Sequence, residues 1–241
     1  MNPFALAYHH ASEHGIIAAV HLPDSSDPVA EDVLLRLHPG EATYASTLKG
    51  FRQVSFVGGR LALRLAAQQL GQQPAAVLPD PRGTPQLPDE LIGSISHKRT
   101  LAVAMVAKNH GWSIGMDLED YGPPRPGIAK KVLTPRELQQ ISALPEPRQW
   151  LATLVRFSIK ESIYKALDPW VRRYVAFQEA EVIPDNDGGA EVQLDLTGGE
   201  GPFVVRARYA WLHGRLLTSV QIKPSSEVPS QVPTPSLPHP G

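Results

Sequence analysis

The chain contains no cysteine among its 241 residues. This absence excludes a disulfide framework, a thiolate zinc site and a cysteine nucleophile, and it fits a reducing compartment. Long hydrophobic runs are also missing, since no stretch approaches the roughly 18 apolar residues of a membrane span. Residues 1–22 have neither the basic start nor the apolar centre of a secretion signal. We therefore expect a cytoplasmic protein that does not enter a membrane.

An excess of one charge is absent as well, because 23 Lys and Arg residues face 24 Asp and Glu residues. A general nucleic-acid-binding protein normally shows a clear basic excess, so we expect no nucleic-acid partner. The last residues, 224–241, hold six prolines, four serines and one charged side chain, Glu227. So few apolar side chains cannot offset the entropy lost on ordering, and we predict a disordered tail. The residues before it suffice for one large domain or two small ones.

Helical patterns occupy three parts of the chain. Apolar and alanine positions predict a helix over Phe51–Gly71, where Gly71 is a stop signal. Thr134-Pro135-Arg136-Glu137 has the N-cap, the first-turn proline and the third-position acid of a helix start. A further helix is predicted from about Pro147 to Leu167.

Strand patterns occupy the rest of the central and C-terminal sequence. An apolar run predicts a strand over Leu101–Ala107, and alternation from Trp112 to Glu119 predicts a second strand, which we expect to pair with the first as a hairpin. Residues 72–92 should be a loop with at most a short strand. Four more antiparallel strands are predicted near 176–183, 190–196, 203–211 and 215–222. Hairpins and helices without regular alternation indicate the α+β class.

Two acidic residues in the strand predicted at 112–119 are candidates for chemistry. Asp117 and Glu119 project from the same face, with Cα atoms about 6.5–7 Å apart, and Gly115 leaves room beside them. Such oxygen donors suit Mg²⁺, which prefers one or two carboxylates together with waters and substrate phosphates. Taken alone, the pair is also explained by a solvated strand face.

Glu161 strengthens the case for a site. At about 100° per residue, it falls within about 20° of Trp150 and Leu154, on the apolar face of the predicted helix. A buried carboxylate needs a cation, a metal or strong donors nearby. Lys165, one turn later, can be that partner, in which case the pair is structural. Residues 121–175 also hold ten Lys or Arg against four acids, which suits an anionic substrate or an acidic partner.

Three segments together resemble the signature of the phosphopantetheinyl transferases. Gly-Met-Asp-Leu-Glu at 115–119 is similar to that family's Gly-x-Asp-x-Glu, and Phe-Ser-Ile-Lys-Glu-Ser-Ile-Tyr-Lys at 157–165 to its Trp/Phe-x-x-Lys-Glu-(Ala/Ser)-x-x-Lys. Gly-Ser-Ile-Ser-His-Lys at 93–98 resembles its Ser-x-Ser/Thr-His loop. Order and spacing also match. The chain length resembles the larger class, which is similar to the activators of surfactin and enterobactin synthetases.

The resemblance implies a fold of two similar halves related by pseudo-twofold symmetry, with the site at their interface. Each half would be a small antiparallel sheet packed with helices. The N-terminal half would span 1–111 and bind coenzyme A, the C-terminal half 112–223 would hold the metal carboxylates, and 224–241 would be the tail. The larger class also implies a monomer.

The activity implied by the resemblance is transfer of the phosphopantetheine arm of coenzyme A to a serine hydroxyl of an acyl or peptidyl carrier protein, with release of 3',5'-ADP. Such a reaction activates polyketide and nonribosomal-peptide synthases. Asp117, Glu119 and Glu161 would hold Mg²⁺, or Mn²⁺ in its place. Lys165 is a further catalytic candidate that would contact the phosphates. The base for the serine proton would be Glu161 or Glu137, although the capping box at 134–137 explains Glu137 fully.

Basic and hydroxyl side chains are assigned to coenzyme A by the same resemblance. Arg52 and Arg60 are about 80° apart on a helix and can lean toward one phosphate, which suits the arginine fork. Arg82 precedes a Gly-x-Pro sequence where relatives often carry a basic residue. The remaining coenzyme-binding candidates are Ser96, His97, Lys98 and Lys160.

The implied partner is an acidic carrier domain. The segment Arg125–Arg136, with Lys130-Lys131-Val132-Leu133, offers charge and apolar surface for it. Two other functions use the same residues. A magnesium-dependent phosphohydrolase acting on a nucleotide-like diphosphate would need only the three carboxylates, and a non-catalytic binding module would need Glu161 and Lys165 only as a structural pair. The Ser-His-Lys segment and the paired arginines favour transfer.

Overall fold

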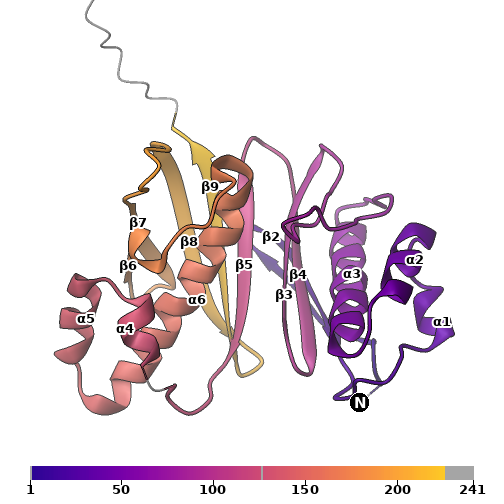
Figure 1. Cartoon of the computed structure of the whole chain (residues 1–241), viewed down its shortest axis with the longest axis horizontal. Helices are drawn as coiled ribbons and strands as arrows, with labels where there is room; N and C mark the ends of the chain where they lie inside the picture. Colours follow the sequence, from indigo (N-terminus) through magenta and orange to yellow (C-terminus); the bar gives the residue numbers. More distant parts are fainter. Residues whose placement is uncertain (1, 126, 226–241) are drawn as a thin grey trace, which may run out of the picture.

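The computed structural model describes residues 2–125 and 127–225. These residues form two antiparallel sheets that stand side by side, and one long helix packs on each sheet (Figure 1). The strand order is β1-β2-β4-β3 in the first sheet and β5-β9-β8-β7-β6 in the second. The predicted α+β class is therefore confirmed. The pseudo-twofold relation and the domain boundaries remain predictions, and most of the predicted tail, 226–241, lies outside the described residues.

The first sheet and its helices come from the N-terminal part of the chain. Helix α3 confirms the helix predicted there, and its Gly58 allows close packing, since a Cβ at this position would meet the Leu22 side chain at 2.2 Å. The first two strands and helices were not predicted. The elements are β1 (Leu6–Ser12), β2 (Gly15–His21), α1 (Glu31–Leu34), α2 (Pro39–Thr47), α3 (Phe51–Gln69), β3 (Leu91–Lys98) and β4 (Leu101–Lys108).

The second sheet holds the remaining elements. Thr134 caps α5 through the predicted capping box with Glu137, and α6 confirms the second long helix, with a few more residues at its C-terminal end. The four C-terminal strands are also confirmed. The elements are β5 (Ser113–Asp120), α4 (Ile128–Val132), α5 (Pro135–Ser142), α6 (Glu146–Val171), the short 3₁₀ helix η1 (Phe177–Glu179), β6 (Ala180–Pro184), β7 (Gly189–Leu194), β8 (Phe203–Leu212) and β9 (Arg215–Pro224).

Strand pairing at the junction of the two sheets differs from the prediction. The hairpin expected between β4 and β5 is wrong, because β4 pairs with β2 and β3 while β5 pairs with β9. Strand β3 instead lies beside β5, and serine hydroxyls bridge the two strands: Ser94 Oγ accepts from Met116 N at 3.0 Å and Ser96 Oγ from Leu118 N at 3.2 Å. The motif at 93–98 is thus a strand and not a loop.

The junction between the two sheets has an apolar core. Buried residues from both sheets, including Ile17, Met105, Met116 and Leu217, form one cluster between them. Helix α3 packs on β2 and β4 and helix α6 on β5 and β9, each on the face of its sheet that points away from the other sheet (Figure 1). Within the described ranges, no helix combines the length and apolar character that crossing a membrane requires.

Candidate active site between the two sheets

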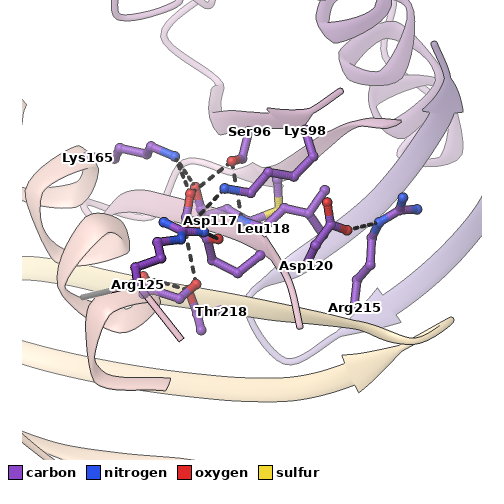
Figure 2. A network of polar contacts seen from close by, with 12 residues as sticks. Ser96, Lys98, Asp117, Leu118, Asp120, Arg125, Lys165, Arg215 and Thr218 are labelled. Atoms are coloured by element: carbon purple, nitrogen blue, oxygen red, sulfur yellow. Dashed lines mark hydrogen bonds and ion pairs between the residues drawn. The ribbon is translucent and has the colours of Figure 1, made fainter. Parts of the chain in front are cut away.

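Helix α6 and strand β5 approach each other very closely. A Cβ on Gly115 would lie 1.9 Å from the backbone oxygen of Ser162, so only glycine fits there. This contact brings the helix bearing Glu161 against the strand bearing Asp117 and Glu119. The two parts of the signature that are distant in sequence therefore meet in space, and Figure 2 shows the polar contacts around Asp117.

Asp117 is buried and receives hydrogen bonds from both halves. Ser96 Oγ of β3 donates to Oδ1 at 2.9 Å, and Lys165 Nζ contacts the same oxygen at 3.2 Å. Ser158 Oγ of α6 donates to Oδ2 at 2.9 Å and also contacts the Thr218 hydroxyl at 3.0 Å. The carboxylate is consequently held in one orientation by contacts from both β3 and α6.

Glu119 is also buried, and two cations contact its oxygens. Lys98 Nζ contacts Oε1 at 2.5 Å, and Arg125 NH2 contacts Oε2 at 2.8 Å (Figure 2). Lys98 was predicted as a coenzyme-binding residue, whereas Arg125 was not singled out for the site. Lys98 and Arg125 therefore place two positive charges at the site, where they could bind an anionic ligand in place of Glu119.

Glu161 lies beside these groups without a donor of its own. Among the described residues it has no hydrogen bond or ion pair, because Lys165 donates instead to Met116 O at 2.8 Å and to Asp117. Burial, followed by the negative charge of Asp117, raises the pKa of the Glu161 carboxyl. The structural Glu161–Lys165 pair is therefore not the arrangement found, and Glu161 keeps free lone pairs.

The donor set suits a hard divalent cation. The negative charges of Asp117 and Glu119 both contribute to the raised pKa of Glu161, and a cation bound near the three carboxylates would relieve this repulsion. Across residues 2–125 and 127–225, however, no three His, Asp or Glu side chains are near enough to hold a metal ion as they stand. Lys98 and Arg125 balance the charge of Glu119 in this arrangement. The magnesium site remains a prediction.

The predicted phosphate-binding residues of the N-terminal half gather in one place. Arg52, Arg60 and His97 line a single cavity of about 390 Å³ beside β3. Arg60 is buried, donates from Nε to Val77 O at 2.5 Å and lies over the Phe56 ring. Burial lowers its pKa to about 10, and burial together with the charge of Lys165 lowers the pKa of His97. The cavity suits an anionic group, as expected for the arginines.

Lys160 and Glu137 do not reach any substrate surface. Both side chains are fully buried and form an ion pair at 2.7 Å. Lys160 Nζ also donates to Val132 O and Phe177 O, and Glu137 accepts from Thr134 N and Val182 N. With all their polar atoms engaged inside the fold, Lys160 cannot contact a coenzyme phosphate and Glu137 cannot act as a base. These two predictions are corrected.

Arg82 and the apolar part of the carrier-binding segment also differ from expectation. Arg82 pairs with Asp168 at 2.6 Å and does not line the cavity of Arg52. Lys130 and Lys131 are exposed, as a docking role requires, but Val132 and Leu133 are buried against Ile141. Apolar contacts with a partner would thus have to come from other residues.

Sequence reasoning missed two residues of the site. Ser158 lies three residues before Glu161 inside the helix motif, so its position facing Asp117 was available from helical spacing. Arg125 gave no such signal, because it lies in a Pro- and Gly-rich loop whose path depends on tertiary packing.

Comparisons with known proteins match both halves of the chain. The profile described as 4'-phosphopantetheinyl transferase superfamily matches residues 113–214, and the 4'-phosphopantetheinyl transferase N-terminal domain matches residues 41–107. These ranges contain all three signature motifs.

Similar proteins carry corresponding names. The chain is 33% identical over 189 residues to the 4'-phosphopantetheinyl transferase Svp of Streptomyces mobaraensis, covering 77% of this chain and 75% of that relative. It is 32% identical over 167 residues to Npt of Nocardia iowensis, covering 65% and 71%. A solved holo-(acyl-carrier-protein) synthase from Bacillus anthracis str. Ames, in complex with CoA (3',5'-ADP), covers 46% of this chain and 96% of its own at 20% identity, with a TM-score of 0.39.

Proposed function

The chain belongs to the 4'-phosphopantetheinyl transferase superfamily, and on this premise we propose that it transfers the phosphopantetheine arm of coenzyme A to a serine hydroxyl of an apo carrier protein. The observation that carries the proposal is the close packing of β5, which bears Asp117 and Glu119, against α6, which bears Glu161, near the cavity of Arg52, Arg60 and His97. Relatives named for this transfer support it.

The coenzyme would bind through its negative charges. Arg52, Arg60 and His97 would receive the nucleotide end with its 3'-phosphate, because guanidinium groups suit phosphate oxygens. Lys98 and Lys165, which contact Glu119 and Asp117, would contact the diphosphate. Both ammonium groups now bond to carboxylates, so they would exchange these partners for phosphate oxygens.

At the phosphorus atom, the reaction forms one P–O bond and breaks another. The serine oxygen attacks the phosphorus that bears the pantetheine arm, the bond from this phosphorus to the bridging oxygen breaks, and 3',5'-ADP leaves with the electron pair. The serine proton goes to a base, and Glu161 is the candidate that the structure offers, because its carboxylate accepts no hydrogen bond and forms no ion pair within the described residues. Lys98 and Lys165 would stabilise the charge that develops on the leaving group.

Asp117, Glu119 and Glu161 would hold Mg²⁺, which, when bound, neutralises a diphosphate and acts as a Lewis acid. Ser96 and Ser158 orient Asp117 for this purpose. Lys98 and Arg125 bond to the two Glu119 oxygens in this structure, so these contacts would have to be released for Glu119 to serve as a metal ligand.

Mass spectrometry of an apo carrier protein tests the proposal. After incubation with this protein, coenzyme A and Mg²⁺, the carrier should gain one phosphopantetheine group on serine, and Glu161→Gln should reduce the rate by about 10²-fold or more. An unmodified carrier would contradict the proposal. Release of 3',5'-ADP from coenzyme A without any carrier would indicate hydrolysis instead.

A further inference from the structure

Residues 78–86, here called the clasp loop, form an ordered turn between α3 and β3. The Asp80 side chain accepts hydrogen bonds from the backbone N–H groups of Arg82 and Thr84, at 2.8 and 2.9 Å. Asp80 N donates to Thr84 O at 2.9 Å, and Gly83 has a φ of 90°, which favours glycine. The loop thus presents Arg82 and Thr84 in a defined conformation.

Both of these side chains fasten the loop to the opposite half of the molecule. Arg82 Nε contacts Asp168 Oδ1 at 2.6 Å, and Thr84 Oγ1 donates to Asp168 Oδ2 at 2.9 Å. Arg82 also donates to Arg173 O at 3.2 Å. The Asp168 side chain is only 12% exposed. Both oxygens of one carboxylate on α6 are therefore bonded to one loop of the N-terminal half.

The clasp loop is also the wall between two cavities. Gly83 and Pro85 line the cavity of about 390 Å³ that contains Arg52 and His97, and they line a second cavity of about 540 Å³ on the other side. The position of Gly83 and Pro85 therefore depends on the hydrogen bonds from Arg82 and Thr84 to Asp168.

Asp168 lies on the same helix as the reacting groups. It follows Glu161 by seven residues, which places it within about 20° around the axis and about 10 Å along it. A single rigid element thus connects the carboxylate site to the clasp loop.

We propose that Asp168 is a positioning residue for coenzyme A: through Arg82 and Thr84 it fixes the wall of the nucleotide cavity at a set distance from the carboxylate site. This inference rests on the proposed function. Because the clasp loop contacts the nucleotide end and supplies no group to the reacting phosphorus, its loosening weakens binding of substrate and transition state alike.

Asp168→Ala and Thr84→Val test this assignment in the full chain. Asp168→Ala should raise both KM for coenzyme A and Kd for 3',5'-ADP, measured by calorimetry, by about tenfold. Thr84→Val should raise both values by a smaller factor. The kcat should stay within about twofold. Thr84→Ser, which keeps the hydroxyl, should behave as the unaltered protein.

Arg208→Ala is the matched control. It removes a bidentate pair with Glu13, at 2.8 and 3.0 Å, that also joins the two halves, but Arg208 lines neither cavity. Unchanged KM and Kd in both Asp168→Ala and Thr84→Val would overturn the inference. An equal increase of KM and Kd in Arg208→Ala would also overturn it, because the effect would then come from loosened contact between the two halves. If Asp168→Ala does not fold, the comparison of Thr84→Val with Thr84→Ser decides. If the unaltered protein binds 3',5'-ADP but does not load a carrier, only the proposed function is contradicted. The comparison of Kd values between variants then still tests the role of the clasp loop.

Discussion

Lys160 shows how burial changes the role that a motif suggests for a residue. Its ammonium has three acceptors inside the fold, Glu137 Oε2 and two backbone oxygens, and no exposed surface. It links α6 to the C-terminal end of α4 and to η1. Burial lowers the pKa of this ammonium, and the adjacent Glu137 opposes that effect. The residue before Glu161 therefore supports the site from within.

Replacing this lysine tests its structural role. Lys160→Met should lower the free energy of unfolding by about 3–5 kcal/mol, because Glu137 is left charged and unpaired in the interior. Urea unfolding measures the loss, and Lys130→Met on the exposed face of α4 should change stability by less than about 0.5 kcal/mol. Near-normal stability combined with a raised KM for coenzyme A would instead favour phosphate contact by Lys160.

His14 gives a pH dependence at the residue scale. The side chain is buried with Nδ1 2.8 Å from Ser219 Oγ, and burial lowers its pKa to about 4. Because the unfolded chain takes up the proton near pH 6.5 and the folded chain only near pH 4, stability should fall as pH decreases through this window, by at most about 3 kcal/mol. His14→Gln should flatten the pH profile of unfolding between these values, while His10→Gln, at an exposed position, should not.

At the scale of elements, the contact between α6 and β5 is the one on which the site depends. Ser162 O and Ala166 N, both backbone atoms, lie 1.9 and 2.7 Å from where a Cβ on Gly115 would be. Such atoms cannot move without displacing the helix. The distance of Glu161 from Asp117 is therefore set by the absence of a single side chain.

Gly115→Ala should separate the two elements. We expect a loss of about 1–3 kcal/mol or more in the free energy of unfolding and a loss of carrier loading beyond what the lower stability explains. Gly122→Ala is the control, because a Cβ there meets no atom within 4 Å. Full activity of folded Gly115→Ala would show that the spacing of α6 and β5 is not critical.

Elements with local signals were predictable, and pairings between distant segments were not. The capping box at Thr134 and the apolar stripes of α3 and α6 are local features, so these helices were predicted close to their observed bounds. The alternation in β5 fits any neighbouring strand, and its partner β9 lies about a hundred residues later, so proximity in sequence favoured the wrong hairpin. The family resemblance assigned Asp117, Glu119 and Glu161 to one site, whereas the burial of Glu137 depends on packing that no local pattern reveals.

For the molecule as a whole, a balanced total charge conceals a local excess. Residues 121–175, which include Glu161, hold ten basic residues against four acids, although the chain carries a net charge of −1. Lys130 and Lys131 contribute exposed charge from α4. Such a field accelerates encounter with an acidic partner more than it strengthens the contact itself.

Removing both of these charges should therefore affect the carrier and not the coenzyme. Lys130→Gln combined with Lys131→Gln should raise KM for an acidic carrier protein about fivefold at low salt, less at high salt, and leave KM for coenzyme A unchanged. Lys108→Glu, which alters the net charge by the same two units at a distant exposed position, is the control. Equal effects of the two variants would refute a local docking role.

The strand order of the second sheet also has a consequence for biosynthesis. Strand β5 pairs in its sheet with β9, the last strand among the described residues, and Thr218 of β9 contacts Ser158 beside Asp117. Until residues 215–224 have been synthesised, β5 lacks its partner strand in the second sheet, and Asp117 and Glu119 are not held in position. A nascent chain can thus complete its first sheet early, but the site between the two sheets can form only after β9 has left the ribosome.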